Sequence, residues 1–377
     1  MRRLTMRSRR HRTTAPAPPL PPVVNTPPKQ ADLHKPTDLP MLSAGDIAPP
    51  CSVSSLDGPV VDIQADAIAG NPIVLVFWPR LSKACSDALS AAVAVSPSFT
   101  AAGARLFLIT LESENVARAR NIPFPVLLDR DGKVFETFGA DTRDTPTTVV
   151  LRPNQHVLAV LRSDPSRQAA DALAHLERIA AERRTLAMAH HPPVLMVPDV
   201  LSPDDCRTLM DVFETRGQTF VPPGPGIDYI GTDYKMRIPE HGRSDRIDHW
   251  LVDNDTTALL HRRLEKRLLP EIFKAFHYRI TRWERMRIGC YHGERGGKLH
   301  GHRDNVEPTP YRRFAMSINL NTQDFSGGEL RFPEFGDQRY RPADGTAIVF
   351  SSALLHEALH VTSGRRLVVL AFMFGDH

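Results

Sequence analysis

The sequence lacks a run of about 18 consecutive apolar residues, which is the length that a membrane-spanning helix needs. No apolar stretch follows the first arginines, so a secretory signal peptide is not expected either. Cysteine is scarce, and no two of the four cysteines form a C-x-x-C pair: Cys51, Cys85, Cys206 and Cys290. This usage fits a reducing cytoplasm better than a disulfide framework. We therefore expect a cytoplasmic protein with no membrane partner.

A strong charge imbalance is also absent, because the formal net charge is only +4. Much of the excess lies between Arg2 and Arg12, which meet no acid before Asp32. The rest of the chain is nearly neutral, so a nucleic-acid partner is not expected for the folded part. Residues 1–40 continue as a proline-rich segment, which cannot bury enough apolar surface to offset its ordering entropy. We predict a disordered tail there; a nucleic-acid-touching arm or a targeting peptide is the alternative.

The length of 377 residues exceeds one ordinary core and predicts two domains. Residues 41–185 alternate strand and helix patterns. Ile73 to Trp78 is a continuous apolar run bounded by turn residues, as in a buried strand, and a helix follows from about Lys83. Further segments predict strands at 106–109 and 126–128, a hairpin at 147–151 and 157–161, and a helix from Ser166 to about Arg183. This alternation implies a three-layer α/β domain.

This first domain resembles the thioredoxin-like superfamily, in particular its peroxiredoxin/redoxin (AhpC/TSA-type) branch. The resemblance rests on Gly45-Asp46-Ile47-Ala48-Pro49, on the strand that enters Trp78-Pro79, and on Cys85 at the start of the next helix. Thr145-Pro146-Thr147 occupies the place of the family's cis-proline, and an X-Pro bond before a strand could take that isomer. The resemblance implies a thioredoxin-like fold for residues 41–185.

Cys85 is the candidate catalytic nucleophile of this domain. A thiol in the first turn of a helix is expected to have a lowered pKa, because the exposed amides and the helix dipole stabilise its anion. Ser82 lies where peroxiredoxins place a threonine. However, the spacing from Pro79 to Cys85 is one residue short of the peroxidase motif, and no resolving cysteine lies nearby. Two hypotheses stay open: a thiol peroxidase, or a non-catalytic module that presents substrate or mediates formation of a homodimer.

Residues 186–195 form the predicted boundary to a second domain, residues 194–377. The sequence Ser202-Pro203-Asp204-Asp205 predicts a helix N-terminus, with serine as the cap and proline in the first turn. A second helical region runs from Asp255 to Phe276 and is interrupted by Pro270. From Tyr278 onwards, short strands separated by glycine turns predict a sandwich or barrel, with the helices packed on one face of its sheet.

Two histidines and one carboxylate in the second domain have the spacing of metal ligands. His302 and Asp304 form an H-x-D pair, and alternate residues of a strand face the same side. The distant His356 completes the set if the fold returns to that point. Two imidazoles and one carboxylate are the ligands of mononuclear non-heme Fe(II) with open positions. His300 has the same parity as His302 and is the rival ligand.

Arg366 follows His356 by ten residues and could pair with a dicarboxylate co-substrate. Together with the turn at Phe325 to Leu330, these motifs make residues 194–377 resemble the 2-oxoglutarate/Fe(II)-dependent oxygenases of the prolyl 4-hydroxylase-like group. The resemblance implies a double-stranded β-helix, a jelly-roll or cupin-like fold, with supporting helices. It also implies that Arg366 and Tyr291 bind 2-oxoglutarate and that three side chains bind Fe(II): His302, Asp304 and His356.

The same resemblance implies a dioxygenase that hydroxylates an unidentified substrate and releases succinate and CO2. The substrate is either a prolyl residue of a protein or peptide, or a small molecule, and O2 is the second co-substrate. The resemblance also implies ascorbate as an auxiliary reductant. Asp304 favours hydroxylation, because relatives that halogenate lack the metal-binding carboxylate.

Two rival hypotheses concern the same chain. His356-Glu357-Ala358-Leu359-His360 has the form H-E-x-x-H of zinc proteases, which requires a helix. Here the flanks are strand-like and Thr362-Ser363-Gly364 breaks the chain, so a protease is disfavoured and His360 is expected in a loop. The second rival makes the redoxin half the catalyst, a thiol peroxidase acting through Cys85, with the oxygenase half accessory.

Overall fold

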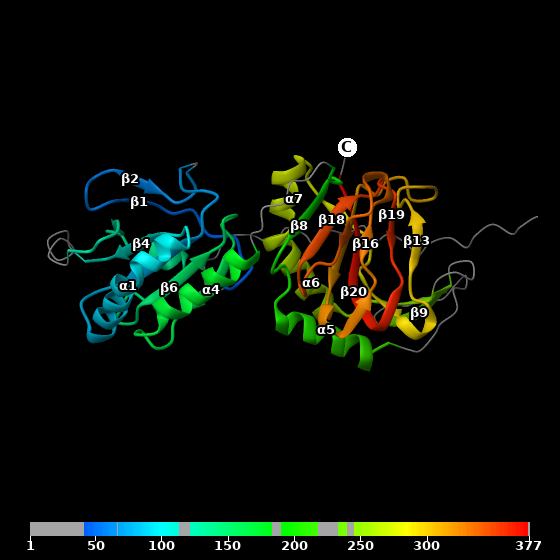
Figure 1. The fold of residues 1–377 in the computed structure, drawn as a ribbon, viewed down its shortest axis with the longest axis horizontal. Coiled ribbons are helices and arrows are strands. Elements are labelled where there is room, and N and C mark those ends of the chain that lie inside the picture. Colours follow the sequence, from blue (N-terminus) through cyan, green and yellow to red (C-terminus); the bar gives the residue numbers. More distant parts are fainter. Residues whose placement is uncertain are drawn as a thin grey trace, which may run out of the picture.

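The computed structural model describes residues 41–65, 67–112, 121–182, 190–217, 233–239 and 245–375. The predicted tail, residues 1–40, and residues 186–189 of the predicted boundary lie outside the described residues. Within the described part, the chain forms an N-terminal α/β unit and a C-terminal unit built mainly from strands (Figure 1). No helix of this part is both long and apolar enough to cross a bilayer.

The N-terminal unit is built on a five-stranded sheet with the strand order β5-β4-β3-β6-β7. Its strands are β3 (Ile73–Trp78), β4 (Arg105–Thr110), β5 (Val126–Leu128), β6 (Thr147–Leu151) and β7 (Val157–Leu161). β3, β4 and β5 are parallel, and β6 and β7 form an antiparallel hairpin beside β3. All six residues of β3 are buried, which explains why this segment is continuously apolar.

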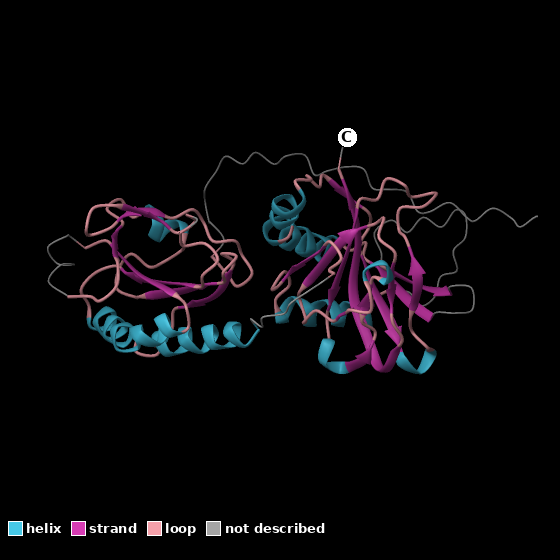
Figure 2. Ribbon diagram, turned by 45° about the horizontal axis from the view of Figure 1, so that its top comes forward, coloured by secondary structure: helices cyan, strands magenta, loops and turns pink. Residues whose placement is uncertain are grey.

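Helices cover both faces of this sheet. α1 (Lys83–Ala101) and α4 (Gln168–Glu182) pack side by side on one face, and α3 (Lys133–Thr137) packs on the other with the small sheet of β1 (Ser52–Ser54) and β2 (Val60–Asp62) (Figure 2). The predicted three-layer, thioredoxin-like arrangement is confirmed. The expected cis bond is not found: the only cis peptide among the described residues is Glu307–Pro308, so Thr145–Pro146 is trans.

Two facing sheets form the C-terminal unit. Among the described residues the larger sheet has the path β8-β18-β14-β20-β12-β10-β9, and β11 and β15 also pair with β20. Its strands are β8 (Val194–Val197), β9 (Tyr234–Pro239), β10 (Asp245–Trp250), β11 (Arg282–Trp283), β12 (Arg287–His292), β14 (Phe314–Asn319), β15 (Phe325–Gly327), β18 (Ala347–Ser351) and β20 (Val361–Phe374).

The smaller sheet has the order β13-β19-β16-β17. Its strands are β13 (Leu299–His302), β16 (Leu330–Arg331), β17 (Arg339–Tyr340) and β19 (His356–Ala358). Apolar side chains from both sheets, including Phe332, Phe350 and Val368, form a core between them. This is the predicted double-stranded β-helix.

Three helices pack on the outer face of the larger sheet, as predicted: α5 (Pro203–Thr215), α6 (Asn254–Arg267) and α7 (Leu269–Phe276). Ser202 caps α5 by accepting the backbone N–H of Asp205, whose carboxylate accepts the N–H of Ser202 in return. The break between α6 and α7 falls at Leu268, directly before the turn that carries Pro270. Proline in a first helical turn starts α7 without losing a hydrogen bond.

Polar contacts join the two units. Asp46 of the N-terminal unit is completely buried and accepts hydrogen bonds from Lys266 and Arg267 at the end of α6, at 2.7 and 3.0 Å. Arg152 pairs with Asp199 at 2.7 Å. Gly45 has a φ of +87°, and a Cβ there would lie 2.0 Å from the carbonyl oxygen of Asp199, so only glycine fits. The Gly45-Asp46 pair thus lies in the interface with the C-terminal unit.

Candidate metal and co-substrate site

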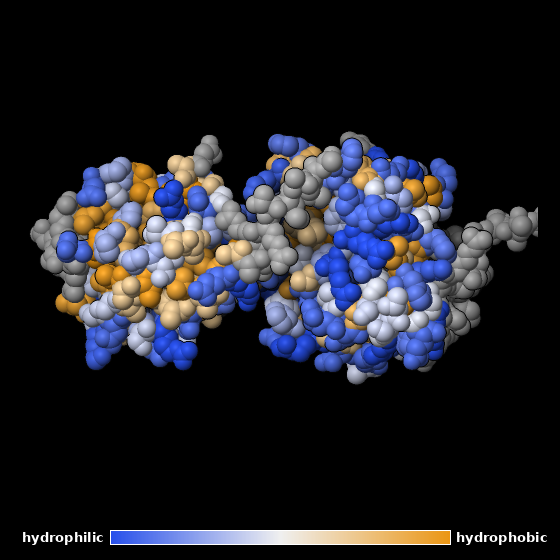
Figure 3. Space-filling model, viewed as in Figure 1, coloured by the Kyte–Doolittle hydropathy of each residue, from blue (hydrophilic) through white to orange (hydrophobic). Residues whose placement is uncertain are grey.

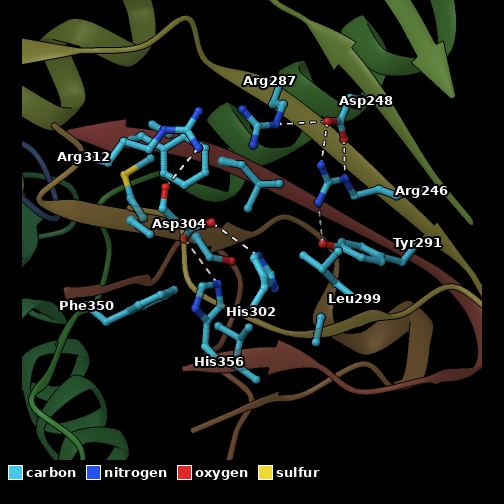
Figure 4. A pocket seen from close by; sticks show the side chains of 18 of the residues that line it. Arg246, Asp248, Arg287, Tyr291, Leu299, His302, Asp304, Arg312, Phe350 and His356 are labelled. Carbon is cyan, nitrogen blue, oxygen red and sulfur yellow. Dashed lines mark hydrogen bonds and ion pairs between the residues drawn. The ribbon is translucent and has the colours of Figure 1, made fainter. Parts of the chain in front are cut away.

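The fold brings His302, Asp304 and His356 together. β13 and β19 are antiparallel neighbours, and His302 is the direct cross-strand partner of His356. Asp304 lies just beyond the end of β13, and its two carboxylate oxygens are each 3.3 Å from the Nε2 atom of one histidine. The possible ligand atoms of all three residues lie within 4.8 Å of one another (Figure 4). Among the described residues this is the only such cluster of histidine, cysteine and acidic side chains.

Backbone carbonyls fix the orientation of both imidazoles. His302 Nδ1 lies 2.7 Å from the carbonyl oxygen of His300, and His356 Nδ1 lies 3.0 Å from that of Leu354. A carbonyl oxygen can only accept, so Nδ1 carries the proton and donates it in each case. Each Nε2 then presents a lone pair towards Asp304, which is the tautomer that binds a divalent metal. The donor set therefore fits Fe(II).

Burial and charge keep this cluster in its metal-binding protonation state. Burial lowers the pKa of His356, more than the charge of Asp304 raises it, so the imidazole stays neutral at neutral pH. Burial alone would raise the pKa of Asp304, but its interactions with the two neighbouring imidazoles and with the cation of Arg312 outweigh this and lower it. A neutral imidazole and an ionised carboxylate are the forms that ligate metals.

The two rival histidines stand outside the cluster. His300 contributes its backbone carbonyl to His302 rather than its ring. His360 is exposed and follows the end of strand β19, so His356 and His360 do not share a helix face. Glu357, the acid of the H-E-x-x-H pattern, is paired with Arg331 at 2.5 Å. The arrangement therefore lacks the geometry of a zinc protease.

Arg366 and Tyr291 form one wall of the same cavity. They are cross-strand partners on β20 and β12, and the guanidinium carbon of Arg366 lies 5.4 Å from the centre of the Tyr291 ring. Arg366 is only 3% exposed and donates to Asn319 Oδ1 at 3.0 Å and to Ser317 Oγ at 3.3 Å. No described acid forms a salt bridge with it. A buried cation of this kind favours an incoming carboxylate.

The predicted glycine turn makes room for this arginine. Gly328 has a φ of +70°, and a Cβ there would lie 3.2 Å from Cδ of Arg366 and 2.8 Å from Val361. Any residue other than glycine would be strained at this φ, and its Cβ would crowd the aliphatic part of the Arg366 side chain. The turn before β16 is therefore a structural requirement of the Arg366 position.

The cavity has a volume of about 270 Å³. Several residues that line it were not identified as site residues from the sequence. Arg246, Asp248 and Trp250 alternate along β10, and Arg287 alternates with Tyr291 along β12, so all of them line the interior. Arg312 joins them from the segment before β14. The sequence does contain a pattern that could have identified them: charged residues at alternate positions of a strand. Charged side chains that face the interior of a β-sandwich indicate a polar cavity rather than an apolar core.

Ion pairs hold most of these residues in place. Arg246 contacts both oxygens of Asp248, at 2.6 and 2.8 Å, and donates from Nη1 to the hydroxyl of Tyr291 at 3.2 Å. Because the Tyr291 hydroxyl accepts from Arg246, its own proton is available for a bound anion. Arg312 contacts both oxygens of Glu284, at 2.5 and 2.6 Å. The cavity wall is thus fixed before any ligand arrives.

Cys85 lies at the start of α1 as expected, but the lowered pKa expected for it is wrong. The residue has no exposed surface, and its thiol donates to the carbonyl oxygen of Asp144 at 3.3 Å. Burial raises the pKa of Cys85, and this outweighs the hydrogen bonds from Ser82 and from the Arg80 backbone that lower it. Arg80 is engaged in an exposed ion pair with Asp144 at 2.8 Å. The described structure therefore provides no activated thiolate.

Comparisons with known proteins divide the chain in the same way. Residues 44–160 match the AhpC/TSA family, and residues 286–374 match the 2OG-Fe(II) oxygenase superfamily. The N-terminal unit thus contains an AhpC/TSA domain of thioredoxin-like fold. The C-terminal unit contains a 2OG-Fe(II) oxygenase domain, which makes the chain an oxidoreductase. A search of curated proteins found no significant match.

Several solved structures are similar to the N-terminal part. Peroxidoxin BcpB from Mycobacterium tuberculosis is 22% identical with a TM-score of 0.33, over 37% of this chain and 98% of that one. Peroxiredoxin Q from Xanthomonas campestris is 22% identical with a TM-score of 0.31, over 34% and 91%. A putative thiol:disulfide interchange protein DsbE from Chlorobium tepidum is 22% identical with a TM-score of 0.31, over 36% and 99%.

Proposed function

We propose that this protein is an Fe(II)- and 2-oxoglutarate-dependent dioxygenase that hydroxylates its substrate and releases succinate and CO2. The observation that carries the proposal is the convergence of two imidazoles and one carboxylate in a cavity that also contains the buried Arg366. His302, Asp304 and His356 would hold Fe(II) and leave positions open for other ligands. When bound, the metal supplies the electrons with which O2 is activated at the expense of 2-oxoglutarate.

The residues of the chain have separate tasks in this scheme. Arg366 binds the distal carboxylate of 2-oxoglutarate through a planar, charge-assisted fork, and Tyr291 donates its hydroxyl proton to the same group. Asn319 and Ser317 keep the guanidinium of Arg366 in its plane. Phe350 packs 4.6 Å from the His356 ring and excludes water from that side of the cluster. Ascorbate would act as the reductant that restores Fe(II) after uncoupled turnover.

The match of residues 44–160 to the AhpC/TSA family favours a second candidate, a thiol peroxidase acting through Cys85. The buried thiol with a raised pKa opposes it, because only the thiolate attacks a peroxide. We therefore assign the redoxin unit a non-catalytic role in presenting substrate or forming a homodimer. Apolar side chains gather over the α1 and α4 face of this unit (Figure 3). Val93 of α1 is also exposed, which supports a self-association surface.

The test is anaerobic addition of Fe(II) and then 2-oxoglutarate to the full chain, followed by absorption spectroscopy. A visible charge-transfer band is expected for wild type, and admission of O2 should release succinate. The band should be lost in His356→Ala and retained in Cys85→Ser. A band of equal intensity in His356→Ala, or no band in wild type, would reject the proposed function.

A further inference from the structure

The guanidinium of Arg287 is a buried cation that the described residues leave without a hydrogen bond. It lies on β12, lines the cavity and is 7% exposed. Its Nε atom lies 3.1 Å from Asp248 Oδ2, but the geometry is not that of a hydrogen bond. None of the five N–H donors of this guanidinium has a hydrogen-bond partner among the described residues. Burying such a group is costly unless a ligand satisfies it.

The neighbouring acids are already used by other arginines. Arg246 occupies both oxygens of Asp248, and Arg312 occupies both oxygens of Glu284. Three cationic groups therefore share two carboxylates, and one positive charge remains. Burial lowers the pKa of Arg287; the charge of Asp248 opposes this, whereas the charges of Arg246 and Arg312 lower it further. Arg287, which shares Asp248 with Arg246 and forms no other ion pair among the described residues, is therefore the least compensated cation of the three.

The proposed metal and co-substrate do not neutralise this charge. The two positive charges of Fe(II) and the one of Arg366 are balanced by Asp304 and the two carboxylates of 2-oxoglutarate. In Figure 4, Arg287 lies beside Asp248 on one side of the cavity, and His356 lies on the opposite side. One further anion is required in the cavity, and it has to come from the substrate.

The surroundings of Arg287 favour a flat anion with two oxygens. The guanidinium carbon lies 5.0 Å from the Trp250 ring and 5.1 Å from the Phe372 ring, so two aromatic side chains fix its position. A guanidinium held in a fixed plane can donate two parallel hydrogen bonds to the two oxygens of one carboxylate. Trp250 Nε1 is buried, lines the same cavity and has no partner among the described residues, which makes it a further donor.

We propose that the substrate is a small carboxylic acid, and that Arg287 binds its carboxylate while the C–H bond to be hydroxylated faces His302 and His356. This inference rests on the proposed function and names its substrate class. A cavity of about 270 Å³ that also admits 2-oxoglutarate accommodates a molecule of amino-acid size. A prolyl residue within a peptide chain has no carboxylate to place on Arg287.

The test compares acids with their uncharged amides in succinate-release assays of the full chain with Fe(II), 2-oxoglutarate and O2. The probes are the free L-amino acids and simple short-chain carboxylic acids, each paired with its primary amide, together with neutral prolyl peptides. At least one acid should stimulate succinate release about tenfold more than its amide, because the amide cannot form the charge-assisted contact. No stimulation by any acid, equal stimulation by acid and amide, or stimulation by the neutral peptides alone would overturn the proposal.

Variants separate this site from the co-substrate site. Arg287→Gln should remove the preference for the acid and leave the KM for 2-oxoglutarate within about twofold, and Arg287→Lys should restore part of the preference. Arg339→Gln removes a similar charge from an exposed strand and serves as the control. A rise in the KM for 2-oxoglutarate as large as that of Arg366→Gln would overturn the assignment of Arg287. The charge-transfer band of wild type is measured first, so failure of the oxygenase function is recognised separately.

Discussion

Asp46 and Arg267 are 221 positions apart in the chain and form a buried ion pair, with Oδ1 and Nε 3.0 Å apart. The exposed fraction is 0% for Asp46 and 1% for Arg267. Asp46 belongs to the redoxin motif, whereas Arg267 ends a helix whose other residues pack on the oxygenase sheet. The redoxin unit is therefore joined to the oxygenase unit by a contact that cannot be exchanged for water without cost.

Replacement of Asp46 should weaken this junction. Asp46→Asn leaves Arg267 buried without its anion, and we expect a loss of about 3 kcal/mol in the free energy of unfolding. Chemical denaturation of the full chain measures it. Glu177→Gln, an exposed change of the same kind on α4, is the control and should have almost no effect. Equal stability of wild type and Asp46→Asn would contradict the buried pair.

The contribution of Asp46 should disappear in acid. Burial raises its pKa, but the hydrogen bonds from Lys266 and Ser43 and the charge of Arg267 outweigh burial, so its pKa lies below the usual 3.8. A depressed pKa stabilises the fold above 3.8, and this stabilisation is lost as the pH falls through the folded-state value. The difference in unfolding free energy between wild type and Asp46→Asn should therefore be constant near neutral pH and shrink below 3.8. A difference that grows as the pH falls would show that folding raises the pKa of Asp46 instead of lowering it.

Metal binding should depend on His356 and not on His360. His356→Ala should weaken Fe(II) binding more than about 100-fold, since even loss of a residue that supports a ligand costs 10–100-fold. His360→Ala, the change at the second histidine of the H-E-x-x-H pattern, should leave metal affinity unchanged. Anaerobic metal titration with a chelator as competitor measures both. Comparable losses in the two variants would favour the protease geometry instead.

Co-substrate binding should depend on the charge and fork of Arg366. Arg366→Gln should raise the KM for 2-oxoglutarate about 10–100-fold, because hydrogen bonds to charged groups contribute roughly 1.5–3 kcal/mol. Arg366→Lys keeps the charge and should show a smaller rise, since an ammonium group still attracts the carboxylate but lacks the planar fork. Initial rates of succinate release at varied 2-oxoglutarate give both values. An unchanged KM in Arg366→Gln would place the co-substrate elsewhere.

Cys85 should be inert towards peroxide. Its raised pKa keeps it protonated at neutral pH, so Cys85→Ser should change peroxide consumption by the reduced chain by no more than about twofold. Succinate release should be unaffected. Rapid peroxide consumption that is lost in Cys85→Ser would instead establish the thiol peroxidase.

The sequence was informative wherever a pattern is local. The apolar run at Ile73–Trp78, the capped start at Ser202 and the H-x-D pair each predicted a feature that lies within a few residues, and each element is present. The pKa of Cys85 was predicted wrongly because it depends on burial and on the charge of Asp144, 59 positions away. Arg287 was missed for a similar reason: its significance comes from Asp248 and Trp250, which reach it only through the pairing of β10 with β12. Asp46 likewise gave no local indication that its partner belongs to the other unit.

The position of the two histidines on the smaller sheet has a mechanical consequence. Among the described residues β13 is the edge strand of that sheet and pairs with β19, and it supplies His302 and leads directly to Asp304. A cation bound between His302 and His356 would pin this edge strand to the interior, because each strand contributes one ring. Release of the cation and fraying of residues 299–304 are then a single coupled equilibrium, so chelators should increase amide hydrogen exchange there before it rises in the rest of the β-helix.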